Sequence, residues 1–325
     1  MGTLVLLAGW TIVWPMLQSG HCIKIRSATD FQVIAVLWKS RHDYVESLKY
    51  SPDGRFLASA TSDATSDVTM TLWDTRSGEA VWSRRGVGDV CDCVFSNGGR
   101  TLLAACRDGW LRSWDVSSGR PGRSIRLYRG GLWCAGFSRD GTLVAVCTNS
   151  SRSQHVLVAR TKDGAHVLDR ACDAQWLALS PDGGTLALAV DKKVDILKVR
   201  GDVFERSLLG VRYSVRTIAF SANGRLLVGT DGNMYAWRIS DGVLVHRAPA
   251  DAKEPSWYFL FAPPAFSPDG RRFVAPGNAL IIWDLLTGRA YSVDTGAVSL
   301  YMATAVAFSP DGRSLAVGED YFSRP

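Results

Sequence analysis

The most regular feature of the sequence is a short segment of alternating apolar and polar residues that runs into a turn of the type Ser-Pro-Asp-Gly-Arg. Such alternation is typical of β-strands. Pro, Asp and Gly in this order favour a tight turn, because Gly supplies the positive φ that a hairpin needs. The sequence therefore predicts a series of β-hairpins. The segments end, seven times along the chain, at Tyr50, Phe95, Phe137, Leu179, Phe220, Phe266 and Phe308.

The spacing of these copies predicts the architecture. Successive copies are 45, 42, 42, 41, 46 and 42 residues apart, and a period of about 40–45 residues is typical of one four-stranded propeller blade. In the fullest copy the expected strands are residues 45–50, 56–60 and 68–73, with an outer strand around 80–82. The chain is therefore predicted to be all-β, a seven-bladed β-propeller of four-stranded antiparallel blades.

The two ends of the repeat array complement each other. The seventh copy supplies only two strands, 304–308 and 314–319, whereas residues 22–26 and 33–38 have the pattern of a third and an outer strand. Pairing the N-terminal with the C-terminal strands in one blade would close the ring and remove exposed sheet edges. We therefore expect a single propeller domain over residues 22–325.

Residues 1–21 form an apolar segment outside this repeat. The apolar run 4–17 contains Trp10, Trp14 and Pro15 and is shorter than the ~18 residues that span a bilayer. It has no Lys or Arg ahead of it, as a signal peptide would. Residues 2–5 repeat the Gly-Thr-Leu-Val of 141–144, which favours a remnant strand over an export signal. Both interpretations stay open, as does the possibility that the chain is part of a longer array.

The ends of the third strands carry a resemblance to a known family. The third strand ends in a Trp-Asp dipeptide at Trp73, Trp114 and Trp283. At Trp237 the tryptophan is kept, but Arg238 replaces the Asp. Together with the Ser-Pro-Asp-Gly turns, these dipeptides make residues 22–325 resemble the WD-repeat β-propeller family, in particular bacterial members with degenerate repeats. The resemblance implies that the four tryptophans pack between blades.

The sequence departs from the family pattern in one respect. Members tend to carry Gly-His before the first strand of each blade, and this chain has no Gly-His. The Asp-His-Ser-Trp hydrogen-bond network of the family therefore cannot be complete in any blade. This departure puts the rigidity of individual blades in question and leaves the fold prediction unchanged.

Composition adds two expectations. The chain is 46% apolar and 21% charged, as in soluble globular proteins, with a net charge of +6. Four positive charges crowd together at Arg120, Arg123, Arg126 and Arg129, which we interpret as a solvated outer strand. Nucleic acid is therefore not the favoured partner, and a membrane would be one only if residues 1–20 were an anchor.

The seven cysteines cannot all pair internally, because their number is odd. Cys93, Cys106, Cys134 and Cys147 fall in apolar strand patterns, where a free thiol acts as a small hydrophobe. The pattern predicts core thiols in a reducing compartment, hence a cytoplasmic protein. Export or membrane anchoring through residues 1–20 is the alternative.

The sequence contains no recognisable catalytic motif. The five histidines are scattered, and neither a Gly-x-Ser-x-Gly elbow nor a phosphate-binding Gly-x-x-x-x-Gly-Lys occurs. We therefore predict no catalytic residue, no cofactor, no metal site and no enzymatic activity. An exported propeller enzyme or sensor that uses the central channel is the alternative.

The resemblance implies a non-catalytic scaffold that binds a protein or peptide partner where outer strands lead into the next inner strands. Aromatic residues and Arg, the residues typical of interface hot spots, gather at these connections. Insertions at 61–67 and 249–258 enlarge loops on the same face. Pro263 and Pro264 should distort the inner strand of the sixth blade. The candidate partner-binding residues are Tyr44, Trp110, Trp133, Arg212, Arg216, Trp257, Tyr258 and Tyr301.

Overall fold

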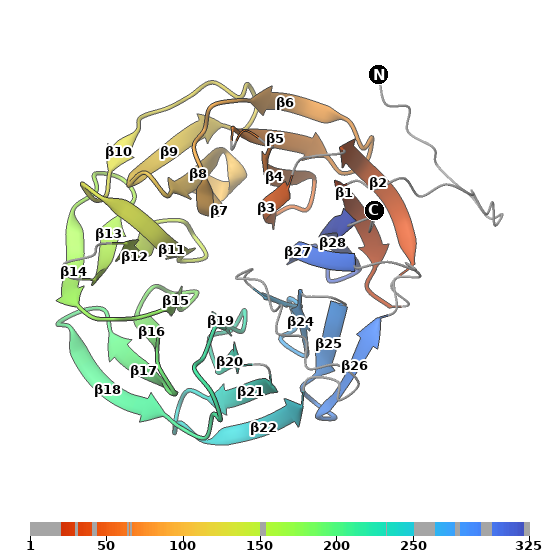
Figure 1. Ribbon diagram of the computed structural model, residues 1–325. Coiled ribbons are helices and arrows are strands. Elements are labelled where there is room, and N and C mark those ends of the chain that lie inside the picture. The colour runs from red at the N-terminus through yellow and green to blue at the C-terminus, as the bar shows by residue number, and fades with distance from the viewer. Residues whose placement is uncertain are drawn as a thin grey trace.

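The computed structural model describes residues 21–29, 32–40, 44–63, 65, 67–149, 154–231, 233–249, 264–276, 280–293 and 301–321. These residues form seven four-stranded antiparallel sheets arranged as blades around a central axis (Figure 1). In the described part of the chain the one helical element is the 3₁₀ turn η1 (Asn97–Gly99). The predicted seven-bladed β-propeller is confirmed.

Six blades are continuous in sequence, and the strands of each follow one another from the innermost to the outermost. Blade 1 consists of β3 (Tyr44–Tyr50), β4 (Phe56–Ser62), β5 (Val68–Asp74) and β6 (Ala80–Arg84). Blade 2 consists of β7 (Val90–Ser96), β8 (Thr101–Cys106), β9 (Trp110–Asp115) and β10 (Ile125–Arg126). Blade 3 consists of β11 (Gly131–Phe137), β12 (Leu143–Asn149), β13 (His155–Arg160) and β14 (His166–Ala171).

The next three blades follow the same order around the ring. Blade 4 consists of β15 (Trp176–Leu179), β16 (Thr185–Val190), β17 (Lys193–Lys198) and β18 (Val203–Leu208). Blade 5 consists of β19 (Thr217–Phe220), β20 (Leu226–Thr230), β21 (Asn233–Arg238) and β22 (Leu244–Pro249). Blade 6 consists of β23 (Ala265–Phe266), β24 (Arg272–Ala275), β25 (Leu280–Asp284) and β26 (Arg289–Val293).

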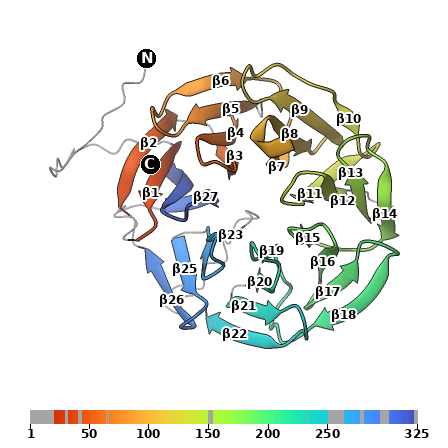
Figure 2. The same ribbon diagram turned by 180° about the vertical axis from the view of Figure 1, so that it is seen from behind.

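Blade 7 joins the two ends of the repeat array, as predicted. Its inner strands are β27 (Tyr301–Phe308) and β28 (Ser314–Tyr321), and its outer strands are β1 (His21–Ser27) and β2 (Val33–Ser40). Strand β1 pairs antiparallel with β28, from His21 opposite Asp320 to Ser27 opposite Ser314. Both views show β1 beside the last strands of the chain (Figures 1 and 2).

A buried cluster of charged side chains holds this closure. Glu319 on β28 is fully buried, and its carboxylate accepts hydrogen bonds from Arg26 Nε at 3.1 Å and Arg26 Nη2 at 2.6 Å. Lys24 forms a second ion pair with the same carboxylate. Both cations belong to β1, so the contacts join strands from opposite ends of the chain.

Alternating connections give the ring two different faces. The turn face carries the turns from first to second and from third to fourth strands. The loop face carries the connections from second to third strands and from each outer strand to the next inner strand. On the turn face, the proline of one turn lies against the glycine of the next turn. The distance from the proline to the position that a Cβ would take on the glycine is 3.4 Å for Pro52 and Gly99, 3.5 Å for Pro268 and Gly312, and 3.4 Å for Pro310 and Gly54. Each of these turns thus packs on the next.

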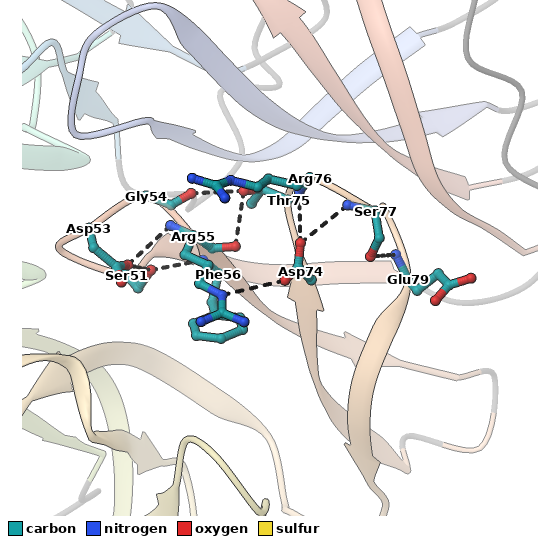
Figure 3. Close-up of polar contacts among 10 residues, drawn as sticks. All are labelled: Ser51, Asp53, Gly54, Arg55, Phe56, Asp74, Thr75, Arg76, Ser77 and Glu79. Atoms are coloured by element: carbon teal, nitrogen blue, oxygen red, sulfur yellow. Dashed lines mark hydrogen bonds and ion pairs between the residues drawn. The ribbon is translucent and has the colours of Figure 1, made fainter.

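The Ser-x-Asp-Gly turns are held by their own side chains (Figure 3). Ser51 Oγ donates to Asp53 Oδ1 at 2.6 Å and accepts the Phe56 N–H at 2.9 Å, while Gly54 adopts a φ of 71°. The Ser51 hydroxyl and backbone N–H groups lower the pKa of Asp53. The same hydroxyl-to-side-chain hydrogen bond recurs in Ser138–Asp140, Ser180–Asp182, Ser221–Asn223, Ser267–Asp269 and Ser309–Asp311.

The Asp of the Trp-Asp dipeptide caps the following turn. In blade 1, Asp74 Oδ1 accepts the N–H groups of Arg76 at 2.9 Å and Ser77 at 3.2 Å (Figure 3). Thr75 Oγ1 donates to the Gly54 carbonyl at 2.8 Å, which joins this turn to the Ser-x-Asp-Gly turn. These carboxylates therefore stabilise turns.

The core is a ring of apolar clusters between neighbouring blades. Trp73, Trp114, Trp237 and Trp283 are all buried in these clusters, as predicted. In blade 1, Trp73 Nε1 donates to Ser59 Oγ at 2.9 Å, so one pair of the family network is present without its histidine. In blade 5, Trp237 Nε1 instead donates to the Leu209 carbonyl at 3.0 Å.

Blade 6 has the shortest described inner strand. Pro263, the first of the two prolines expected to distort this strand, lies outside the described residues. Strand β23 contains only Ala265 and Phe266, and it begins directly after Pro264. Proline has no N–H to donate to a ladder, which accounts for the position of Pro264 outside the strand.

Candidate functional site

The loop face presents exposed aromatic side chains from several blades. Tyr44 begins β3, Trp133 lies near the start of β11, and Tyr213 lies in the connection that leads into β19. The exposed fractions of their side chains are 43%, 40% and 53%. These positions follow from the fold, because every inner strand begins at the loop face.

Trp133 and Arg107 form the most structured pair on this face. The Arg107 guanidinium carbon lies 5.8 Å from the centroid of the Trp133 ring, and Arg107 Nη1 donates to the Trp133 carbonyl at 3.4 Å. Trp133 Nε1 donates to the Gln175 carbonyl of the next blade at 3.1 Å. The indole is therefore held in place although much of its surface faces solvent.

A second pair lies at blade 5. The Arg212 guanidinium carbon lies 5.5 Å from the centroid of the Tyr213 ring. The buried Asp231 accepts the backbone N–H groups of Arg212 at 3.0 Å and Tyr213 at 2.7 Å, and the Tyr235 hydroxyl at 3.0 Å. One carboxylate thereby fixes the backbone that presents both side chains. Arg216, also exposed, lies three residues further on.

Other candidates from the sequence have different surroundings. Trp110, at the start of β9, is half-buried, and the Arg126 guanidinium of the outer strand β10 lies 5.1 Å from its ring centroid. It therefore belongs to the rim of blade 2. The side chains of Trp257, Tyr258 and Tyr301 lie outside the described part of the chain.

Arg107 and Asp231 were missed by sequence reasoning. Arg107 opens an Arg-Asp-Gly turn that looks like any hairpin connection, and Asp231 belongs to another Asp-Gly pair. Glu46 was missed as well: its Oε2 accepts the Val90 N–H at 2.9 Å, and burial raises the pKa of this carboxyl group. Only the tertiary structure reveals these roles, between neighbouring blades for Arg107 and Glu46 and within blade 5 for Asp231.

The described residues offer no arrangement for metal binding: no three His, Cys, Asp or Glu side chains converge there. Six of the cysteines are free thiols, namely Cys91, Cys93, Cys106, Cys134, Cys147 and Cys172, and Cys93, Cys106, Cys134 and Cys147 are buried as predicted. Among the described residues no helix is long and apolar enough to cross a membrane.

Comparison with known proteins identifies related sequences. The family description "WD domain, G-beta repeat" matches residues 32–66, 80–115 and 205–238. Apoptotic protease-activating factor 1 of Rattus norvegicus is 24% identical over 254 residues, which are 76% of this chain and 16% of that protein. A WD repeat-containing protein of Synechocystis sp. is 27% identical over 150 residues, 45% of this chain and 41% of that protein. The chain spans less than half the length of either relative.

A solved structure matches most of the chain. The β-propeller domain of Cps50 (Swd1) from Myceliophteria thermophila superimposes with a TM-score of 0.68. The sequence identity is 16%, and the match covers 85% of this chain and 96% of that domain. The likeness therefore concerns the fold alone.

Proposed function

Because this chain is a WD-repeat β-propeller, we propose that it is a non-catalytic scaffold that binds a protein or peptide partner on its loop face. Propellers with WD40 repeats typically bind proteins or peptides. The observation that carries the proposal is the presence of exposed aromatic side chains beside arginines on that face, at Trp133 with Arg107 and at Tyr213 with Arg212.

These pairs have the properties of interface hot spots. Trp, Tyr and Arg dominate hot spots because they bury a large area on binding. The Trp133 indole is already fixed by its hydrogen bond to Gln175, and Asp231 fixes the backbone of Tyr213. Fixed groups lose less conformational entropy on association, so more of the contact free energy remains as affinity.

We also propose that the protein is located in the cytoplasm. The free thiols of Cys91, Cys93, Cys106, Cys134, Cys147 and Cys172 support a reducing compartment, where such groups persist. The mass of the protein from its own cells tests this proposal, because removal of an N-terminal export signal would shorten the chain.

The scaffold proposal is tested by comparing loop-face variants with a variant of the outer wall. Trp133→Ala with Tyr213→Ala should weaken binding of the partner more than about tenfold, since truncating one hot-spot residue costs about 2 kcal/mol or more. Phe204→Ala on β18 is the matched control, because Phe204 is similarly exposed, at 49%, but lies on the outermost strand of its blade.

The measurement is quantitative affinity purification from lysate, followed by titration of the protein recovered. A partner retained by the wild type and by Phe204→Ala but lost from the double variant supports the proposal. A partner that binds all three proteins equally would place the docking surface elsewhere.

A further inference from the structure

The central channel contains a cavity of about 520 Å³, lined by all seven inner strands. The lining runs along β3, β7, β11, β15, β19, β23 and β27 to the turn face, where Pro52, Pro181, Pro268 and Pro310 border it. Ligand pockets have volumes of about 300–1,000 Å³. The cavity therefore has the size of a small-molecule site, and it lies apart from the loop-face pairs described above.

The side chains that line the cavity are mostly apolar, with one charged pair on one side. Lys49 Nζ on β3 lies 3.5 Å from Asp92 Oδ1 on β7, and the two side chains are 40% and 13% exposed. The apolar part of the lining includes the half-buried Phe137, Phe220 and Phe308. The cavity is therefore amphiphilic.

The charged pair departs from the repeat. The residue before the end of the inner strand is Lys49 in blade 1, and six small or apolar residues occupy this position in the other blades: Val94, Gly136, Ala178, Ala219, Ala265 and Ala307. Asp92 stands three positions before the end of the inner strand of blade 2. In the other blades this position holds an uncharged residue: Ser47, Cys134, Trp176, Thr217, Pro263 and Ala305. The five blades other than 1 and 2 have no charge at either position, so the fold does not require the pair.

The charges of the lining favour an anion. Lys49 and Arg139 are its cations and Asp92 its anion. The nearby Asp92 carboxylate raises the pKa of Lys49, so the amine stays protonated at neutral pH. An ammonium group has three N–H donors. Asp92 is its one ion-pair partner among the described residues, which leaves donors for a second carboxylate.

We propose that the central channel binds a small apolar carboxylic acid. Its carboxylate accepts hydrogen bonds from Lys49, and its hydrocarbon part lies against the half-buried side chains of Phe137, Phe220 and Phe308. Binding expels water from apolar side chains, and the ion pair determines which end of the ligand faces Lys49. This function is independent of partner binding on the loop face.

The test is calorimetric titration of the full chain with octanoate at pH 7, with octylamine as a probe of the same length and opposite charge. Wild-type protein should bind octanoate and should bind octylamine at least tenfold more weakly. Lys49→Met should weaken octanoate binding about tenfold or more, because a hydrogen bond to a charged group is lost. Asp92→Asn should strengthen it, because a competing carboxylate disappears.

Lys193→Met is the matched control. Lys193 lies on β17, is 42% exposed and pairs with Asp195 at 2.9 Å, but it is not part of the channel lining. This variant should bind octanoate as the wild type does.

Equal binding of octanoate and octylamine, no binding of octanoate at millimolar concentration, or unchanged affinity in Lys49→Met would each overturn the proposal. If Lys49→Met does not fold, the Asp92→Asn arm decides: unchanged or weaker binding of octanoate there contradicts the assignment. Retention of a loop-face partner by Lys49→Met would show that partner binding does not depend on the channel site.

Discussion

Replacing Glu319 by Gln tests how the ring is closed. The substitution keeps the shape of the side chain and removes its negative charge. Arg26 is 4% exposed, and Glu319 is fully buried. Both hydrogen bonds from Arg26 go to Glu319 Oε1, for which Gln still has a carbonyl oxygen. Lys24 pairs with Oε2, which the amide NH₂ group of Gln replaces. The change therefore leaves buried positive charge on β1 without its carboxylate.

The expected loss follows from the burial of this pair. Removing one partner of a buried ion pair costs about 3–5 kcal/mol. A globular domain has a free energy of unfolding of about 5–15 kcal/mol, so the variant should lose a large part of it. The β1–β28 ladder is the non-covalent closure of the ring, so its weakening should also expose blade 7 to proteases.

The assay is urea denaturation followed by tryptophan fluorescence, with limited proteolysis in parallel. Glu205→Gln on β18 is the control, since Glu205 pairs with the half-exposed Lys198 at 3.3 Å and such pairs contribute about 0–1 kcal/mol. A free energy of unfolding within about 1 kcal/mol of the wild type for Glu319→Gln would refute the reasoning on buried charge.

Three further predictions concern the blades. Tyr50→Phe should raise the free energy of unfolding by about 1 kcal/mol in urea denaturation, because the buried Tyr50 hydroxyl has no hydrogen-bond partner among the described residues; a destabilised variant would contradict this. Ser59→Ala should cost about 1–3 kcal/mol in the same assay, since it leaves the buried Trp73 N–H unpaired; no loss would show that the bond is dispensable. Hydrogen bonding, first from the Ser180 hydroxyl, lowers the pKa of Asp182 below 3.8, so its stabilisation is present at higher pH and is lost as pH falls through the folded-state pKa. Asp182→Asn, which copies the natural Asn223 turn, should therefore make stability fall less steeply below about pH 4, and an unchanged acid limb would count against this account.

The repeat in the sequence predicted the fold because propeller blades are built from local contacts. Each hairpin is specified by alternating side chains and by a Ser-x-Asp-Gly turn whose hydrogen bonds join residues at most five positions apart. The incomplete first and last copies likewise predicted the pairing of β1 with β28. These features needed no knowledge of which blade faces which.

The candidate site was less predictable, because it depends on side chains from different blades. Aromatic residues at the starts of inner strands could be assigned to the loop face, as for Tyr44 and Trp133, but not their exposure. Trp110, at the start of the third strand β9, was assigned to the same face but lies half-buried beside Arg126 at the rim. Trp257 and Tyr258 stay predictions.

The sequence by itself determined the blade repeat, the turns and the closing blade, because these follow from periodicity and from contacts close in the chain. Only the tertiary structure decided which polar groups meet. Lys49 and Asp92 are 43 positions apart (92 − 49) and lie together because blades 1 and 2 are neighbours. Glu319 and Arg26 meet because the ring closes. Local patterns do not encode such pairs, since burial and charge partners depend on the facing surface of another blade.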